Sequence, residues 1–290
     1  MIVGTGRVAP GIAAAFAAVG VDVVVAGRDE TRAADCAAAA SAFSGARVRG
    51  GALGPETFAG ATLVIETVVE SLEVKQGLLE TIEPWVDGEA LIVSNTSSLP
   101  LDEVAAPLRD RTRFAGLHFL HPAHLTRVVE IVAATQTAPR TIAALLELAA
   151  RMEKRPIVVR RAVPGYVWNR LQMAMLRECL ELVEQGVADA ESVDAAVADG
   201  LAPRWLAAGP LATADAGGIG TFHEIARQLF PTIASGTEPP ELLTQAQASG
   251  GLYDWTDDER DALDPVRRDA LKHGAEIAAR RPRPRPRGAS

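Results

Sequence analysis

The chain has 290 residues, enough for two domains, and its 48% hydrophobic and 23% charged residues are typical of an ordinary soluble globular protein. No apolar run approaches the roughly 20 residues that a membrane span needs, so we expect a cytoplasmic protein and no membrane partner. The formal net charge of -8 disfavours nucleic acid as a partner. Cys36 and Cys179 lie in unrelated segments without CxxC spacing, which argues against a disulfide framework and a zinc cluster.

The start of the chain carries a nucleotide-binding signal. A very short apolar stretch runs into Gly4-x-Gly6-x-x-Ala9 and then into a predicted helix over residues 10–19. Glycines at a strand-to-helix turn allow a tight turn and bring a pyrophosphate close to the backbone amides. The next predicted strand, residues 21–26, follows at the distance that a βαβ unit requires. We therefore predict a dinucleotide site at this turn.

The residues after the second strand bear on the choice of cofactor. NAD-binding units usually place Asp or Glu there for the ribose hydroxyls, whereas this chain has Gly27 and Arg28. An arginine at this point can pair with a 2'-phosphate, and Ala9 in the third glycine position fits the same preference. The sequence thus favours NADP(H) over NAD(H), and the alternative is a solvated Arg28 in a protein that uses NAD.

Alternating strands and helices continue through the first half of the chain. Further strands are predicted over residues 61–66, 90–95, 113–119 and 128–132, and further helices over residues 29–42, 73–85 and 139–153. This alternation indicates an α/β domain with a parallel sheet covered by helices. The segment from Arg28 to the strand at 61–66 is predicted to hold one helix and little else.

From about Pro164 onward, apolar residues recur at helical spacing, which predicts a helical second domain. The end of the chain alternates Arg and Pro, a pattern that precludes a helix and favours a solvated, extended tail. We expect a nucleotide-binding domain over residues 1–162, a helical domain over 163–279 and the tail over 280–290.

Three of the five histidines, His118, His121 and His124, stand three residues apart. This spacing does not place all three on one face of a helix or strand, and no nearby Cys or carboxylate completes a ligand set, so a metal site is disfavoured. His118 instead closes a predicted strand at its carboxyl end, where open α/β sheets bind ligands. A reversal through Pro122 would bring Glu130 to the imidazole, as the partner of a general base. A satisfied structural histidine is the alternative.

Successive segments of the chain resemble the signatures of the L-3-hydroxyacyl-CoA dehydrogenases. They are LVIETVVESLEVK (63–75), SNTSSL (94–99), GLHFLHP (116–122), VVEIV (128–132), PGYVWNR (164–170) and GPLATAD (209–215). The resemblance implies a Rossmann-type, doubly wound N-terminal domain and an all-helical C-terminal domain that forms a homodimer. It also implies an oxidoreductase that transfers a hydride between a nicotinamide cofactor and C3 of a 3-hydroxyacyl substrate.

The same motifs assign roles to single residues. His118 matches the general base and Glu130 its orienting partner, while Ser97 and Asn169 match donors to the substrate oxygens. Further matches fall on positions that line the cofactor and substrate cleft, namely Glu70, Lys75 and Asn95. These roles suit the chemistry, because a proton leaves the hydroxyl as a hydride leaves the carbon.

Departures from the family pattern leave more than one class of substrate possible. The family generally has a long helical excursion between the second strand and LVIE that helps to hold the CoA nucleotide, whereas Glu66 here follows Gly27 by only 39 positions. A 3-hydroxyacyl group on an acyl carrier protein, or a small free hydroxy acid, is therefore an alternative to an acyl-CoA. His121 stands where the family has Asn and is expected to be structural, and His124 is expected at the surface or the cleft rim. A non-catalytic dinucleotide-binding scaffold or sensor is the rival from another class.

Overall fold

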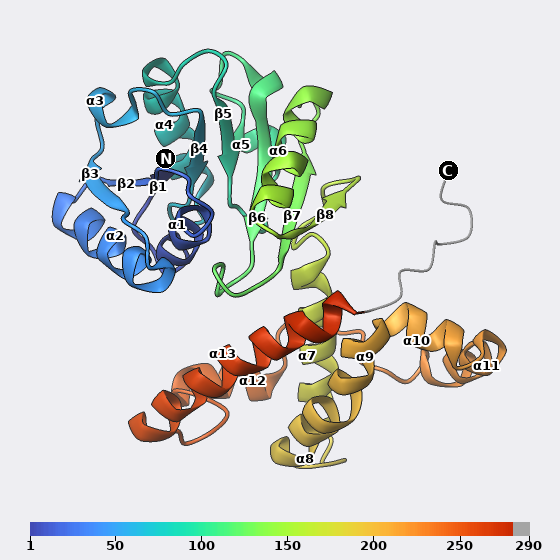
Figure 1. Cartoon of the computed structure of the whole chain (residues 1–290). Helices are drawn as coiled ribbons and strands as arrows, with labels where there is room; N and C mark the ends of the chain where they lie inside the picture. The colour runs from blue at the N-terminus through green and yellow to red at the C-terminus, as the bar shows by residue number, and fades with distance from the viewer. Residues whose placement is uncertain (281–290) are drawn as a thin grey trace. The chain divides into compact units, whose positions relative to one another are not determined.

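The computed structural model describes residues 1–280, so the predicted tail lies outside the described residues apart from Arg280. The chain divides into two compact units, one over Met1–Arg170 and one that begins at Leu171. The first unit alternates strands and helices, whereas the described part of the second is helical (Figure 1). This arrangement confirms the predicted fold class.

The first unit is built on one eight-stranded sheet, in the order β3-β2-β1-β4-β5-β6-β7-β8. The strands are β1 (Ile2–Val3), β2 (Val24–Gly27), β3 (Arg49–Ala52), β4 (Leu63–Glu66), β5 (Leu91–Ser94), β6 (Phe114–Phe119), β7 (Val128–Ala133) and β8 (Arg155–Val159). Every neighbouring pair is parallel except β6 and β7, which are antiparallel. The strand order reverses beside β1, and in such sheets ligands bind at the carboxyl ends of the strands next to the reversal.

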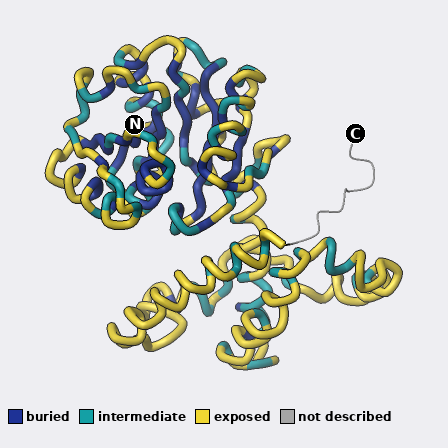
Figure 2. The backbone as a smooth tube through the Cα atoms, viewed as in Figure 1, coloured by how far each residue is buried: buried dark blue, intermediate teal, exposed yellow. Residues whose placement is uncertain are grey.

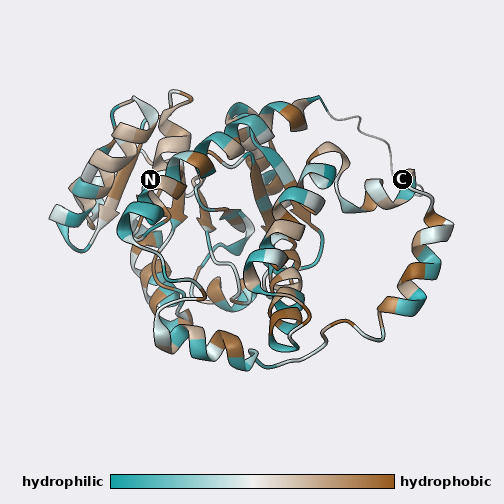
Figure 3. Cartoon of the chain, turned by 90° about the horizontal axis from the view of Figure 1, so that it is seen from below, coloured by the Kyte–Doolittle hydropathy of each residue, from teal (hydrophilic) through white to brown (hydrophobic). Residues whose placement is uncertain are grey.

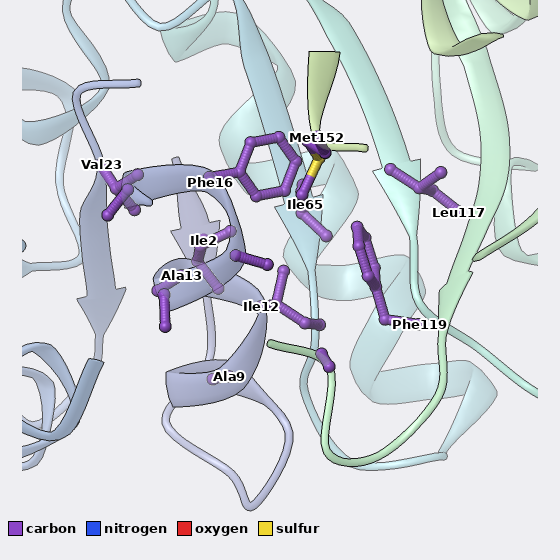
Figure 4. Packing of buried hydrophobic residues seen from close by; sticks show 14 of the residues in the cluster. Ile2, Ala9, Ile12, Ala13, Phe16, Val23, Ile65, Leu117, Phe119 and Met152 are labelled. Carbon is purple, nitrogen blue, oxygen red and sulfur yellow. The ribbon is translucent and has the colours of Figure 1, made fainter. Parts of the chain in front are cut away.

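Helices cover both faces of this sheet because its strands are apolar on both sides. On one face lie α1 (Ala9–Ala17), α2 (Glu30–Ser44) and α6 (Pro139–Arg151). On the other lie α3 (Pro55–Phe58), α4 (Leu72–Ile82) and α5 (Leu101–Val104), with the short 3-10 turns η1 (Glu83–Trp85) and η2 (Arg111–Arg113) nearby in the chain. Ile12 and Phe16 of α1 point to the sheet, where the Phe16 ring centre lies 6.0 Å from that of Phe119 (Figure 4).

The segment between β2 and β4 corrects one prediction. It contains α2, the edge strand β3 and the four-residue α3, not a single helix. The sequence of β3, RGGA, has neither β-branched residues nor alternation, so no strand signal marks it. Its glycine Gly50 is needed for packing, because a Cβ there would lie 2.7 Å from the backbone of Ala34 in α2.

The second unit consists of helices with little core of their own. After α7 (Trp168–Glu184) come α8 (Ala190–Ala195), the π-helical turn η3 (Ala196–Leu201), α9 (Ala202–Ala208), α10 (Pro210–Ala216), α11 (Ile219–Leu229), α12 (Glu241–Ser249) and α13 (Asp257–Ala279). Among residues 171–280 the buried hydrophobic side chains are Leu180, Val193 and Ala246. Exposed residues therefore dominate this unit in Figure 2, and apolar residues recur along its helices in Figure 3. Within residues 1–280 no helix combines the length and apolar character that a membrane crossing requires.

Candidate active site

The glycine-rich turn after β1 has the geometry of an anion-binding site. Gly4 has φ +122°, and a Cβ on it would lie 2.9 Å from the backbone carbon and oxygen of Thr67. Gly6 is exposed, and its nearest neighbour would be the Thr67 oxygen at 3.9 Å, so the space in front of it is open. Ala9 begins α1 and is buried, and no side chain caps the first turn of that helix. The Ala9 N–H donates to the Gly6 carbonyl oxygen at 3.1 Å and Pro10 has no N–H, so the open space in front of Gly6 and the uncapped helix start are the features that fit the pyrophosphate of a dinucleotide.

Arg28 follows the carboxyl end of β2 and is exposed. A Cβ on the preceding Gly27 would lie 2.9 Å from the Thr5 side chain, which explains the glycine. The next residue is acidic, but the Asp29 carboxylate accepts a hydrogen bond from the backbone N–H of Arg32 at 3.1 Å and caps α2. Arg28, Asp29 and Glu30 are all exposed beyond this strand, and of the first two only Asp29 has a side-chain hydrogen bond within residues 1–280.

His118 and Glu130 are direct partners across the antiparallel pair β6 and β7. His118 Nδ1 lies 2.7 Å from Glu130 Oε2, and Glu130 is 0% exposed. The other oxygen, Oε1, accepts the backbone N–H groups of Val167 at 2.9 Å and Trp168 at 3.0 Å. Burial raises the pKa of Glu130, but the hydrogen bonds from His118 and from the two amides outweigh it and hold the pKa below the ordinary value.

An ionised Glu130 determines the tautomer of the neighbouring ring. A carboxylate only accepts hydrogen bonds, so Nδ1 of His118 must carry a proton and Nε2 of the neutral ring is an acceptor. His118 is buried apart from 6% of its surface. This pair can therefore act as a general base with a fixed orientation.

The turn after β5 carries Ser97 and is bound by one carboxylate. Glu70 Oε1 accepts the Thr96 hydroxyl at 2.6 Å, the Ser97 N–H at 2.9 Å, and the N–H and hydroxyl of Ser98 at 3.1 and 3.0 Å. Burial raises the pKa of Glu70, but these bonds and the charge of Lys75 lower it to about 2. Within residues 1–280, no hydrogen bond is made by the Ser97 hydroxyl or by the Asn169 amide at the start of α7, so both are available to a ligand.

Lys75, which the resemblance matches to a position lining the cleft, is buried in this structure. Its side chain is 1% exposed, and its Nζ donates to both oxygens of the fully buried Glu66, at 2.7 and 2.9 Å. Glu70 Oε2 lies 3.3 Å from the same ammonium. Asn95 also has a structural contact, because its Oδ1 accepts the Phe119 N–H at 2.8 Å and joins the ends of β5 and β6.

Tyr166 is a site residue that the sequence analysis missed. Its ring meets the His118 imidazole edge-on, with the centroids 5.7 Å apart. The phenol is 2% exposed, and its hydroxyl has no hydrogen-bond partner among the described residues. Burial and then the charges of Glu70 and Glu130 raise its pKa, so it stays protonated. The motif PGYVWNR was the available signal for this residue. The positive φ of 45° that orients its side chain could not be predicted, because a tyrosine rarely adopts a positive φ.

The other two histidines of the cluster do not join this pair. His121 is exposed, and the His124 ring stacks on Phe43 of α2 at 4.5 Å. The loop that carries them is held by Lys154, whose buried Nζ donates to the carbonyl oxygens of Ala123 and Thr126 at 2.7 and 2.6 Å. Within residues 1–280 no group of three or more His, Cys, Asp or Glu side chains could hold a metal ion.

Two models of one known family match most of the chain. Residues 1–162 match the model of the 3-hydroxyacyl-CoA dehydrogenase NAD binding domain, and residues 165–256 match that of the 3-hydroxyacyl-CoA dehydrogenase C-terminal domain. The 5-formyl-3-hydroxy-2-methylpyridine 4-carboxylate 5-dehydrogenase of Mesorhizobium japonicum is 30% identical over 220 residues, which cover 73% of this chain and 71% of that protein. A probable 3-hydroxybutyryl-CoA dehydrogenase of Deinococcus radiodurans is 32% identical over 197 residues, 68% of this chain and 69% of that protein.

Solved structures give the same two kinds of relative. A crystal structure of 5-formyl-3-hydroxy-2-methylpyridine 4-carboxylic acid 5-dehydrogenase, described as an NAD+-dependent dismutase, superposes with a TM-score of 0.91 at 27% identity, over 97% of this chain and 98% of that one. The (S)-3-hydroxybutyryl-CoA dehydrogenase from Ralstonia eutropha superposes with a TM-score of 0.68 at 29% identity, over 88% of this chain and 98% of that one.

Proposed function

Since the chain belongs to the 3-hydroxyacyl-CoA dehydrogenase family and is a nicotinamide-dependent oxidoreductase, we propose that it interconverts an alcohol and a carbonyl group with His118 as the general base. The observation that carries this proposal is the 2.7 Å contact between His118 and a buried, ionised Glu130, which leaves Nε2 as an acceptor. The bound nicotinamide would supply the acceptor or donor of the hydride, and the turn from Gly4 to Ala9 would hold its pyrophosphate.

The side chains of the site would then have separate roles in the reaction. In the oxidation, the hydroxyl proton moves to Nε2 of His118 while the substrate carbon gives up its hydride, and Glu130 stabilises the imidazolium that results. The Ser97 hydroxyl and the Asn169 amide, which have no other partner within residues 1–280, donate hydrogen bonds to the substrate oxygens. In the reduction the same proton returns from His118 to the new alkoxide oxygen.

His118→Ala tests this proposal against a scaffold or sensor role. A catalyst loses turnover in the variant but keeps its affinity for the dinucleotide, measured by the fluorescence of the reduced cofactor. A scaffold shows no turnover in the wild type on any substrate of the screen below. Turnover that survives in His118→Ala would contradict the assignment of the base.

For the substrate, we propose a small free hydroxy acid or its carbonyl form, with a 3-hydroxyacyl thioester of CoA or an acyl carrier protein as the second candidate. The segment between β2 and β4 supports this choice, because it has no helical excursion for a CoA nucleotide and contains only α2, β3 and the four-residue α3. The higher TM-score with the pyridine carboxylic acid dehydrogenase, 0.91 against 0.68, supports it as well.

A dehydrogenation screen decides between these substrates. Free, CoA-linked and carrier-linked 3-hydroxy acids, together with hydroxymethyl and formyl pyridine carboxylates, are offered with NAD+ or NADP+, and kcat/KM is compared. We expect the free acids to give the highest value. A clear preference for the CoA thioester would contradict the proposal and identify an acyl-CoA as the substrate.

We propose NADP(H) as the preferred cofactor, on the strength of the exposed Arg28 and the commitment of Asp29 to the cap of α2. Arg28→Asp should lower the affinity for NADPH relative to NADH, because it replaces a partner of the 2'-phosphate with a repelling charge. Arg32→Asp, at an exposed arginine in the first turn of α2, is the matched control. A preference that is the same in the wild type and in Arg28→Asp would refute the proposal.

We also propose a cytoplasmic homodimer that forms through the helical unit. Large apolar side chains of this unit are exposed to solvent, among them Leu211 at 86%, Phe230 at 71% and Val266 at 63%. A helical unit with so small a core gains stability by covering such residues with a second copy. The two free thiols, Cys36 and Cys179, fit a reducing compartment. Sedimentation should give twice the chain mass, and a monomer at micromolar concentration would contradict the dimer.

A further inference from the structure

We propose that Glu70 is a positioning residue that holds the turn after β5, so that the Ser97 hydroxyl is presented to the substrate. This inference rests on the proposed function, in which Ser97 binds a substrate oxygen. It differs from the role that the resemblance implies, in which Glu70 lines the cofactor cleft.

The Ser97 hydroxyl differs from its two neighbours in its hydrogen bonding. The hydroxyls of Thr96 and Ser98 both donate to Glu70 Oε1, as do the N–H groups of Ser97 and Ser98. Thr96 Oγ1 also accepts the N–H of Leu99 at 3.2 Å, which closes the turn. Of the three consecutive hydroxyls, only that of Ser97 has no partner within residues 1–280. Four donors on one oxygen thus fix the backbone on both sides of it.

Glu70 is itself held from the interior of the domain. Its Oε2 lies 3.3 Å from the Lys75 ammonium, which is paired with the buried Glu66 at the end of β4. The Ser94 hydroxyl at the end of β5 donates to the same Glu66 at 2.5 Å. Hydrogen bonds to an ionised acceptor are stronger than neutral ones, and this acceptor is tied to two adjacent strands of the sheet. The position of the turn is therefore fixed relative to the carboxyl edge of the sheet.

The hydrogen bonds of Glu70 are concentrated on one of its two oxygens. Oε1 receives four of them, whereas Oε2 faces the Lys75 ammonium at 3.3 Å and the side chain is 36% exposed. The affinity of the Glu70 variants for the cofactor is therefore the measurement that separates a positioning role from a direct contact with the cofactor.

The turn also reaches the catalytic pair. The carbonyl oxygen of Ser97 accepts the N–H of Gly165 at 3.0 Å. Two residues later, the N–H groups of Val167 and Trp168 donate to Glu130. Fixing the turn therefore fixes Ser97 against the segment that leads into α7, whose second residue is Asn169, the other proposed donor to the substrate.

The test uses the full-length chain with Glu70→Ala, Glu70→Gln, Ser97→Ala and the double variant Glu70→Ala/Ser97→Ala. Glu73→Ala, an exposed glutamate in the first turn of α4, is the matched control. Hydrogen exchange of the amides at 97 and 98, the dissociation constant of the reduced cofactor and the kcat of the best substrate in the screen are measured for each variant.

We expect Glu70→Ala to speed exchange at these amides by at least about tenfold and to lower kcat by about 10- to 100-fold, because Ser97 is no longer held in place. The cofactor dissociation constant should change by less than about twofold, because the loss of a hydrogen bond to the cofactor would change it by more. Ser97→Ala should add nothing further in the Glu70→Ala background, since both changes remove the same contact. Glu70→Gln keeps an acceptor oxygen and should restore a large part of kcat.

Two results would overturn the inference. Unchanged exchange at Ser97 and Ser98 in Glu70→Ala would show that the carboxylate does not hold the turn. Weaker cofactor binding, with effects of the two substitutions that multiply, would return Glu70 to the cofactor site. A wild type without turnover on any substrate would refute the proposed function instead, and the exchange rates would still decide whether Glu70 holds the turn.

Discussion

Glu130→Gln separates the chemistry of the catalytic pair from its stability. The substitution keeps the shape of the side chain but removes its charge. The amide oxygen can still accept the N–H groups of Val167 and Trp168, which now bond to Oε1 at 2.9 and 3.0 Å. The new NH2 group then faces Nδ1 of His118 and must donate to it. The ring proton moves to Nε2, so the atom that should accept the substrate proton is already protonated.

The expected sizes of the two effects differ widely. Two of the three hydrogen bonds to position 130 survive and the third is reversed into a weaker, uncharged bond, so the loss of folding stability should be about 1–3 kcal/mol, within the 5–15 kcal/mol that domains have. A histidine held in the wrong tautomer costs on the order of 10⁴-fold in kcat in a serine protease triad, and a loss of similar size is expected here. Glu130→Ala is the contrast, because it removes the acceptor of three hydrogen bonds at a position with 0% exposure and should cost about 3 kcal/mol or more.

Three measurements check this prediction. Thermal unfolding reports the fold, reduced-cofactor fluorescence reports dinucleotide binding, and nitrogen NMR of the imidazole reports which ring atom carries the proton. The expected Glu130→Gln variant is folded, binds the cofactor, has its proton on Nε2 and does not turn over. A variant with the proton on Nε2 and a kcat within about tenfold of the wild type would refute the reasoning, because the tautomer would then not matter.

Three further predictions concern other parts of the site. Gly4→Ala should cost about 1–3 kcal/mol of stability and abolish dinucleotide binding, because φ is +122° and the new Cβ would lie 2.9 Å from the Thr67 backbone; normal binding of the reduced cofactor would contradict this. Tyr166→Phe removes a buried hydroxyl without a partner among the described residues, so the melting temperature should rise, and a fall would show that the hydroxyl has a partner in solution. The folded pKa of Glu70, about 2, lies below its ordinary value of 4.5, so the ionised carboxylate stabilises the fold above about pH 4.5 and this contribution is lost as the pH falls toward 2. Glu70→Gln should therefore flatten the loss of melting temperature between pH 4.5 and 2, and an unchanged slope would contradict the low pKa.

The sequence predicted the elements that repeat a regular pattern. Apolar runs at the right spacing located β2, β4, β5, β6 and β7 to within a few residues. The glycine turn and the reversal through Pro122 were predicted because Gly permits backbone conformations that other residues disfavour and Pro restricts the backbone. The edge strand β3 was missed because RGGA owes its conformation to the close approach of α2 and not to its own residues.

Site residues were harder to predict where burial or backbone geometry decides their role. The motifs predicted that Lys75 lines the cleft, yet the Lys75 ammonium is buried and paired with Glu66. The sequence alone does not show that a lysine is buried. Tyr166 was missed because its place beside His118 depends on a backbone with positive φ. The His118 and Glu130 pair was predicted because a hairpin brings residues at equal distances from its turn together.

The antiparallel pairing of β6 with β7 has a consequence for how the protein can change over evolutionary time. The distance between the acid and the base of the site is set by backbone pairing, His118 opposite Glu130, and not by the loop that joins the two strands. A substitution at an exposed loop position such as His121 can therefore leave the pair intact, whereas the loop around His124 is restricted by its stacking on Phe43 and by the bonds of Lys154 to the Ala123 and Thr126 carbonyl oxygens. A histidine cluster that looks like one motif thus combines three positions under three different structural constraints.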